Sequence, residues 1–189
     1  TAKELGKNIN TSYFESSASI TADGKTLYFI SERKGGFGLA DIYVSQKITK
    51  TEWGPAVNIG KTINTPFDER MVFIHPNGKY LLFSSDGHST LGGYDIFVCK
   101  FNDKDSTWGK PVNLGYPINT VNDEINFTLT SNGKKAYMSA FKLDGLGEID
   151  IYEIDLSRYD VFLLGDDNSS GYIKEDGVKE FPDERAGGK

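Results

Sequence analysis

Short stretches in which apolar and polar residues alternate recur along the chain. Residues 15–21, 69–75 and 124–130 alternate with a period of two, which is typical of a strand that buries one face. Apolar runs follow at residues 27–30, 81–83 and 136–138, and they predict strands covered on both faces. No segment shows a convincing period of 3.6 residues, so helix is not expected. The pattern predicts an all-β protein.

Turn residues divide these segments into units of four strands. Asp-Gly or Asn-Gly separates the first two strands, and this dipeptide predicts a hairpin with a type I′ turn. A third strand is expected to start at Asp41, Asp95 and Asp150. A short fourth strand is expected at residues 56–59 and 112–114, after a Trp-Gly pair. The dipeptides of the hairpin turns are Asp23-Gly24, Asn77-Gly78 and Asn132-Gly133.

The landmarks keep their register through three copies. Ile-Asn-Thr occurs at residues 9–11, 63–65 and 118–120, in steps of 54 and 55 residues. Repetition at such a period is typical of a repeat architecture, and four antiparallel strands per unit describe a β-propeller blade. Residues 1–156 are therefore predicted to form three blades, at about 5–57, 58–112 and 113–156. Propellers have four to eight blades, so we expect an incomplete or excised ring.

Residues 157–189 break the repeat and are polar and acidic, which predicts an exposed tail or linker. Asp166, Asn168, Ser170 and Gly171 follow the first half of a calcium-loop pattern. The twelfth place, where a bidentate glutamate belongs, is Gly177. Because that ligand is missing, no metal site is predicted.

The composition argues against several classes of partner. The 12 Phe, 10 Tyr and 2 Trp residues supply ample material for a core. A formal net charge of -6 argues against a nucleic-acid partner. No apolar run approaches the roughly 20 residues of a membrane span, so no transmembrane segment is expected. Cys99 has no partner for a disulfide, and its counterparts Ser45 and Ile154 indicate a packing role.

Several motifs resemble one family of repeats over about residues 5–156. The motifs are His75-Pro76-Asn77-Gly78-Lys79, Phe83-Ser84-Ser85-Asp86, Gly92-Gly93-Tyr94-Asp95-Ile96-Phe97 and residues 108–115. They resemble the PD40-type (WD40-like) propeller repeats of bacterial envelope proteins. The variant is most similar to propellers in OmpA-family proteins of Bacteroidota, which include the peptidoglycan-associated component of the type IX secretion system. A broader relative is TolB, a periplasmic propeller that binds a lipoprotein partner.

The resemblance implies a place in the periplasm or at the outer membrane, and a scaffold associated with secretion or peptidoglycan-anchored machinery. Such a scaffold binds a protein partner in the envelope. The chain contains no OmpA-like peptidoglycan-binding domain, so the resemblance carries no peptidoglycan binding to these residues.

The connection between the second and third strands is the best candidate surface. Its closing glycine and the aspartate beyond it persist in each copy, and we expect the glycine to supply a positive φ and the aspartate to accept backbone N–H groups. The residues that vary are expected to be exposed, and recognition often uses variable loops on a common scaffold. Ordinary solvated turns are the alternative interpretation. The candidate binding residues are Arg33, Lys34, Phe37, His88, Tyr94 and Leu146.

Asparagine and glutamate recur at Asn10, Asn64 and Asn119 and at Glu15, Glu69 and Glu124. A catalytic group is needed once, whereas a hydrogen bond between blades is needed at each junction, so these residues are predicted to be structural.

Catalytic motifs are missing. The chain contains no G-x-S-x-G, H-E-x-x-H or phosphate-loop motif. His75, His88 and Cys99 match no zinc spacing, and no cofactor is expected. We therefore expect a non-catalytic module that binds a protein. A glycan-binding surface using Phe37 and Tyr94, and an accessory propeller of a hydrolase, are the alternatives.

Overall fold

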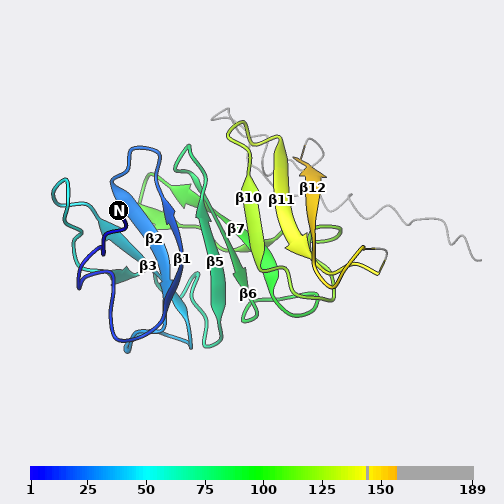
Figure 1. The fold of residues 1–189 in the computed structure, drawn as a ribbon, viewed down its shortest axis with the longest axis horizontal. Coiled ribbons are helices and arrows are strands. Elements are labelled where there is room, and N and C mark those ends of the chain that lie inside the picture. Colours follow the sequence, from blue (N-terminus) through cyan, green and yellow to red (C-terminus); the bar gives the residue numbers. More distant parts are fainter. Residues whose placement is uncertain (144, 157–189) are drawn as a thin grey trace, which may run out of the picture.

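The computed structural model describes residues 1–143 and 145–156, which form three antiparallel sheets (Figure 1). The sheet orders are β1-β2-β3-β4, then β5-β6-β7 with β8 and β9 both paired to β7, then β10-β11-β12. We name these sheets blades one, two and three. The strands are β1 Glu15–Ile20, β2 Thr26–Ser31, β3 Asp41–Gln46, β4 Val57–Asn58, β5 Glu69–Ile74, β6 Tyr80–Ser85, β7 Asp95–Asn102, β8 Thr107–Trp108, β9 Val112–Asn113, β10 Asn126–Leu129, β11 Lys135–Ala140 and β12 Asp150–Asp155.

The expected fold class is confirmed: the protein is all-β, and the antiparallel blades of the described residues do not close into a ring. The described residues include no helix of the length and hydropathy that crossing a membrane requires. The expected tail at residues 157–189, with its partial calcium-loop pattern, lies outside the described residues.

The hairpin turns differ in type from the expectation. Gly24, Gly78 and Gly133 have φ of 69°, 71° and 66°, but the residues before them do not have positive φ, as a type I′ turn would require. In blade one the Gly24 amide donates to the Thr21 carbonyl (2.8 Å), which places the glycine at the end of a longer loop. The Asp23 carboxylate accepts the Lys25 amide (3.0 Å) and stabilises this loop.

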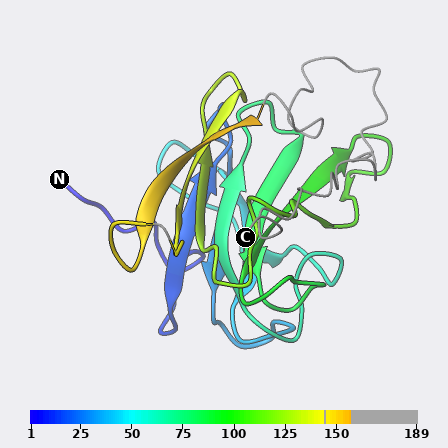
Figure 2. The ribbon, with the colours of Figure 1, turned by 90° about the vertical axis from the view of Figure 1, so that its right-hand side faces the viewer.

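The blades stack face to face, and the core lies at their junctions (Figure 2). One cluster joins blades one and two and includes Ile42, Ile63, Phe83 and Cys99. Cys99 is buried there, and burial raises the pKa of its thiol, which confirms its predicted packing role. A second cluster joins blades two and three. A smaller third cluster, of Ile9, Leu27, Phe29, Tyr43 and Trp53, covers the other side of blade one.

The third blade departs from the prediction that every second strand is covered on both faces. β2 and β6 are buried along almost their whole length, but β11 alternates, with Lys135 and Tyr137 exposed. No described strand follows β12 in this sheet, and Figure 2 shows β12 nearest the viewer. We call the surface formed by Lys135, Tyr137, Ile151 and Glu153 the free face of blade three. The sequence rule failed here because it treated all three copies as interior.

Candidate functional site

The repeated asparagine joins the segment that enters one blade to the third strand of the blade before. The side chain of Asn64 accepts the Ile42 amide (2.9 Å) and donates to the Ile42 carbonyl (2.9 Å). Asn119 makes the same pair of bonds with Ile96 (2.8 and 2.9 Å). These contacts confirm the predicted structural role of Asn64 and Asn119. The side chain of Asn10 is exposed and makes no hydrogen bond within the described residues.

The repeated glutamate binds the segment that enters its own blade, through the threonine that follows the repeated asparagine. In blade two, Glu69 accepts the Thr65 hydroxyl (2.8 Å) and the Ser85 hydroxyl (3.0 Å). Glu69 is fully buried, and among the described residues no basic side chain forms an ion pair with it. Burial therefore raises the pKa of Glu69 to about 8, against the effect of these hydrogen bonds. Burial also raises the pKa of Glu124.

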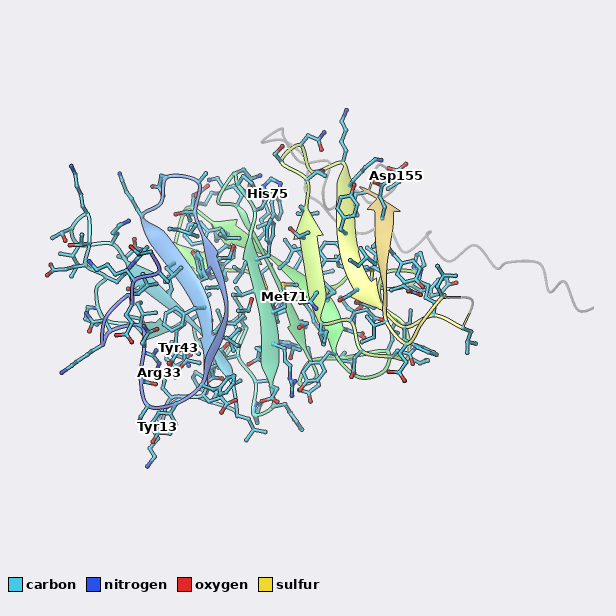
Figure 3. The ribbon with its side chains drawn as sticks, viewed as in Figure 1. Tyr13, Arg33, Tyr43, Met71, His75 and Asp155 are labelled. Atoms are coloured by element: carbon cyan, nitrogen blue, oxygen red, sulfur yellow. The ribbon has the colours of Figure 1, made fainter. Side chains whose placement is uncertain are left out.

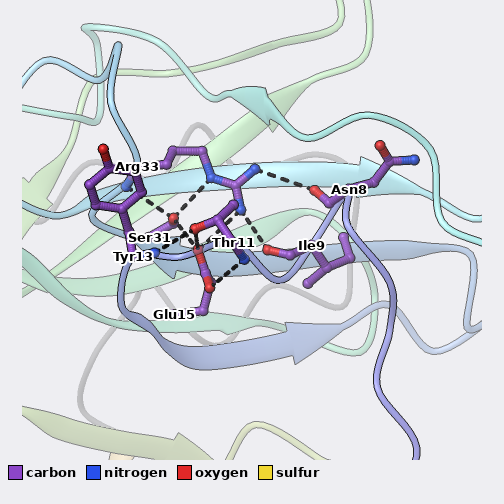
Figure 4. Close-up of polar contacts among 7 residues, drawn as sticks. All are labelled: Asn8, Ile9, Thr11, Tyr13, Glu15, Ser31 and Arg33. Carbon is purple, nitrogen blue, oxygen red and sulfur yellow. Dashed lines mark hydrogen bonds and ion pairs between the residues drawn. The ribbon is translucent and has the colours of Figure 1, made fainter.

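In blade one the equivalent glutamate, Glu15, is paired with a cation, Arg33 (Figure 4). The Arg33 guanidinium lies 3.5 Å from the Glu15 carboxylate, which also accepts hydrogen bonds from Thr11 and Ser31. Burial opposes ionisation of Glu15, but the hydrogen bonds and the Arg33 charge together lower its pKa. Equivalent glutamates thus have pKa values shifted in opposite directions.

Arg33 was expected to be an exposed loop residue, and that expectation is wrong. Its side chain is only 14% exposed. The guanidinium donates to the Ile9 carbonyl (2.6 Å) and lies over the rings of Phe29 and Tyr43, 5.0 and 4.8 Å from their centres. A planar cation fits between two aromatic faces and a carboxylate, so Arg33 packs against Phe29 and Tyr43 of blade one (Arg33 and Tyr43 are labelled in Figure 3).

His88 is likewise half-buried rather than exposed, and it fills the equivalent space in blade two. Its Nε2 lies 2.7 Å from the Ile63 carbonyl, and its ring contacts Phe83 and Phe97 at centroid distances of 5.7 and 5.1 Å. The structure therefore brings Arg33 and His88 to matching places. In the aligned repeats Arg33 corresponds to Gly87, one residue before His88, so the sequence alone does not indicate this match.

The aspartate at the start of each third strand shapes the loop before it. Asp41, Asp95 and Asp150 accept the backbone amides of Phe37 (2.6 Å), Leu91 (2.7 Å) and Leu146 (2.6 Å). This confirms the predicted role of the aspartates. In blade one the Asn58 side chain also donates to Asp41 (3.1 Å), which fixes the carboxylate in turn.

The glycine that closes this loop has a different role from the one expected. Gly38, Gly92 and Gly147 are not among the glycines with positive φ. A Cβ at Gly38 would instead overlap the backbone oxygens of Thr65 and Phe67, and one at Gly92 would overlap the backbone of Val121. Glycine is needed because the segment entering the next blade crosses the loop here. Among the described residues, a Cβ at Gly147 would meet only Asp150, at an ordinary contact distance.

The clamped loops expose one large apolar side chain at the same position in each blade. Phe37 is 51% exposed, Leu91 is 53% exposed and Leu146 is fully exposed. We call these three residues the loop-end apolar set. Lys34 is also exposed, as expected. Sequence reasoning missed Leu91, although its repeat register with Phe37 and Leu146 was a sufficient signal.

Two further exposed apolar residues adjoin these loops, and both belong to segments that enter the next blade. Phe67 and Val121 are 55% and 77% exposed, and their backbones touch the loops at Gly38 and Gly92. The loops of the first two blades therefore lie beside a further exposed apolar residue each, Phe67 and Val121.

Tyr94 is held in place rather than freely presented. Its hydroxyl donates to Asp68 (3.1 Å), and the Arg70 guanidinium lies 4.8 Å from the centre of its ring. Partial burial, together with Asp68, raises the pKa of Tyr94 to about 12. One face of this aromatic ring is therefore covered by an arginine. In the part of the chain that the structure describes, no group of three or more His, Cys, Asp or Glu side chains could hold a metal ion.

Two solved structures resemble this arrangement of blades. TolB from Acinetobacter baumannii matches 74% of this chain and 29% of its own length, with 18% identity and a TM-score of 0.51. A putative TolB from Agrobacterium tumefaciens matches 78% of this chain and 47% of its own length, with 12% identity and a TM-score of 0.52. The fold is that of a TolB-like β-propeller.

These likenesses show the fold alone. The chain spans less than half the length of either TolB structure that it matches. No protein-family model matches the sequence, and no curated protein matches it.

Proposed function

We propose that this chain is a non-catalytic propeller module that binds a protein partner in the bacterial envelope, through the loop-end apolar set. The observation that carries the proposal is the exposure of Phe37, Leu91 and Leu146 at one repeated position, each on a loop clamped by an aspartate. Exposed apolar patches on a rigid scaffold are typical of protein-binding surfaces. A few side chains carry most of the energy of a protein interface, and an exposed aromatic residue such as Phe37 can bury a large area there.

The place in the envelope rests on the resemblance of the repeats to those of periplasmic and outer-membrane proteins, and on the TolB-like fold. Association with secretion or peptidoglycan-anchored machinery belongs to the same proposal. No specific observation favours the glycan-binding or hydrolase-accessory alternatives, and the Arg70 side chain over Tyr94 weighs against a glycan platform on that face of the ring.

A site-specific crosslinking experiment tests the proposal. A photoreactive amino acid is placed at position 37, 91 or 146, and the purified chain is irradiated in envelope extract. The control position is Ile48, which is 65% exposed and lies in the β3–β4 connection beside the Lys25 turn, at the other end of the blade. We expect one protein to crosslink from all three loop positions and not from position 48.

A matched set of variants gives the second readout. Phe37→Ser, Leu91→Ser and Leu146→Ser combined should reduce capture of that protein at least tenfold, whereas Ile48→Ser should not change it. Equal crosslinking from position 48, or full capture by the triple variant, would remove the loop-end apolar set as the binding surface.

A further inference from the structure

Each junction between blades is made by a set of contacts that the chain repeats. Asn64 and Asn119 bracket the backbone of Ile42 and Ile96, and the entering segment crosses Gly38 and Gly92. At the first junction Tyr28 also packs edge-on against Trp108 of blade two, with ring centres 6.0 Å apart.

The free face of blade three carries one half of this set without its counterpart. By repeat register, Tyr137 stands where Tyr28 stands, Ile151 where Ile42 and Ile96 stand, and Gly147 where Gly38 and Gly92 stand. Ile42 and Ile96 are fully buried, but Ile151 is 80% exposed and Tyr137 is 39% exposed. Within residues 1–143 and 145–156, no asparagine side chain brackets Ile151 and no segment crosses Gly147.

Blade one carries the other half of this set of junction contacts, also without its counterpart. The side chain of Asn10 makes no hydrogen bond within the described residues, although Asn64 and Asn119 each make two to a third strand. Trp53 stands where Trp108 stands, and it lines an open pocket of about 420 Å³ together with Ala18, Ile20 and Leu27. By repeat register Ala18, Ile20 and Leu27 stand where Val72, Ile74 and Leu81 stand, and those three residues belong to the cluster that contains Tyr28.

Charge does not decide this pairing. Lys3, Glu4, Lys47 and Lys50 line the pocket of blade one. On the free face of blade three, Glu153 accepts the hydroxyl of Tyr137 (2.6 Å) and is already paired with Lys135 of the same face. The pairing therefore rests on the repeat register of the two surfaces.

We propose that the free face of blade three binds blade one of a second copy of this chain, head to tail. Tyr137 enters the pocket beside Trp53 of the second copy, Asn10 of that copy brackets Ile151, and residues 11–14 cross Gly147. The contact continues an interface that the chain already makes twice. A head-to-tail contact closes only as a ring. With the three blades of the described residues in each copy, two copies give six blades, within the four to eight of closed propellers, whereas three copies give nine.

Sedimentation velocity of the purified chain over a range of concentrations is the direct test. We expect a species of twice the 20.9 kDa chain mass. Asn10→Ala and Tyr137→Ser should each raise the dissociation constant at least tenfold, with an unchanged circular dichroism spectrum, because neither side chain is buried within one copy. Leu91→Ser, at an exposed position of the middle blade, is the matched surface control and should leave the mass unchanged.

Comparing the two variants tests the head-to-tail geometry. Asn10→Ala damages blade one and Tyr137→Ser damages blade three, so a head-to-tail contact is weakened by each of them. A dimer in which like faces meet would be weakened by only one of the two variants. A wild-type chain that stays at 20.9 kDa up to its solubility limit would overturn the proposal. So would a dimer that resists either variant.

Discussion

The side chain of Asn64 brackets the backbone of Ile42, with a hydrogen bond of 2.9 Å to its amide and another of 2.9 Å to its carbonyl. The two residues belong to different parts of a junction: Ile42 lies in β3 of blade one, and Asn64 lies on the segment that leads into blade two. A single carboxamide thus replaces a backbone ladder at the point where the chain passes from one sheet to the next.

Removal of this bracket should destabilise the protein, and the repeat supplies its own control. Asn64→Ala leaves the buried Ile42 amide without a partner, so we expect a loss of about 2 kcal/mol in the free energy of unfolding. Asn10→Ala should change it by less than about 0.5 kcal/mol, because Asn10 is exposed. Urea unfolding at low protein concentration measures both. Equal losses at positions 10 and 64 would contradict the structural role of the bracket.

The buried carboxyl of Glu69 makes stability depend on pH. Its pKa is about 8 in the folded protein and 4.5 in its ordinary state, so between these values the folded state holds a proton that the unfolded state has lost. The free energy of unfolding therefore falls as pH rises from about 5 to about 8, by up to about 1.4 kcal/mol for each pH unit. Urea unfolding at a series of pH values measures the slope.

Two variants assign that slope to Glu69. Glu69→Gln keeps a hydrogen-bonding side chain without the charge, so it should reduce the pH dependence in this window to the part that comes from Glu124, whose pKa burial also raises. Glu153→Gln, at an exposed site, should leave the slope as it is. A slope that keeps its full value in Glu69→Gln would show that the proton is held elsewhere.

Arg33 should act on Glu15 as well as on stability. Arg33→Met keeps the apolar stem but removes the charge beside Glu15 and the hydrogen bond to the Ile9 carbonyl. We expect the pKa of Glu15 to rise, as seen by NMR titration of its carboxyl carbon, and a stability loss of about 1–3 kcal/mol. Arg33→Lys should restore the pKa more than the stability, because an ammonium group cannot reproduce the planar contact with Phe29 and Tyr43. An unchanged Glu15 titration in Arg33→Met would contradict this coupling.

The closing glycines should differ in their tolerance of a methyl group. Gly38→Ala and Gly92→Ala place a Cβ against the backbone of the crossing segment, and we expect each to cost about 3 kcal/mol. Gly147→Ala meets only Asp150 among the described residues and should be neutral within about 0.5 kcal/mol. Thermal unfolding of the three variants at low concentration compares them. A large loss at Gly147 would show that its conservation in the repeat has another cause.

Repetition was the property of the sequence that predicted most of the fold. The period-two segments predicted the strands, and the recurrence of Asn64 and Glu69 predicted their structural roles, because a junction contact must be made in every copy. The aspartate clamp at Asp41 followed from the same logic. These features depend on local pattern and register, which a single sequence contains.

The side-chain positions in the loops depend on space that the sequence does not show. Arg33 and His88 differ between copies and were therefore expected outside, but both fill the same room between an aromatic pair and a backbone carbonyl. The exposure of Tyr137 also escaped prediction, because it depends on what covers β11 and not on β11 itself. The glycine at position 38 was assigned to a positive φ, whereas the deciding fact is a crossing chain almost thirty residues away in the sequence.

The position of Cys99 has a practical consequence. The thiol lies between the first two sheets, and burial keeps it protonated, so an alkylating reagent reaches it only when those sheets part. Its rate of labelling in native buffer therefore gives the frequency of that opening, without any engineered probe. Labelling of Cys99 thus measures how stable the contact between the first two blades is.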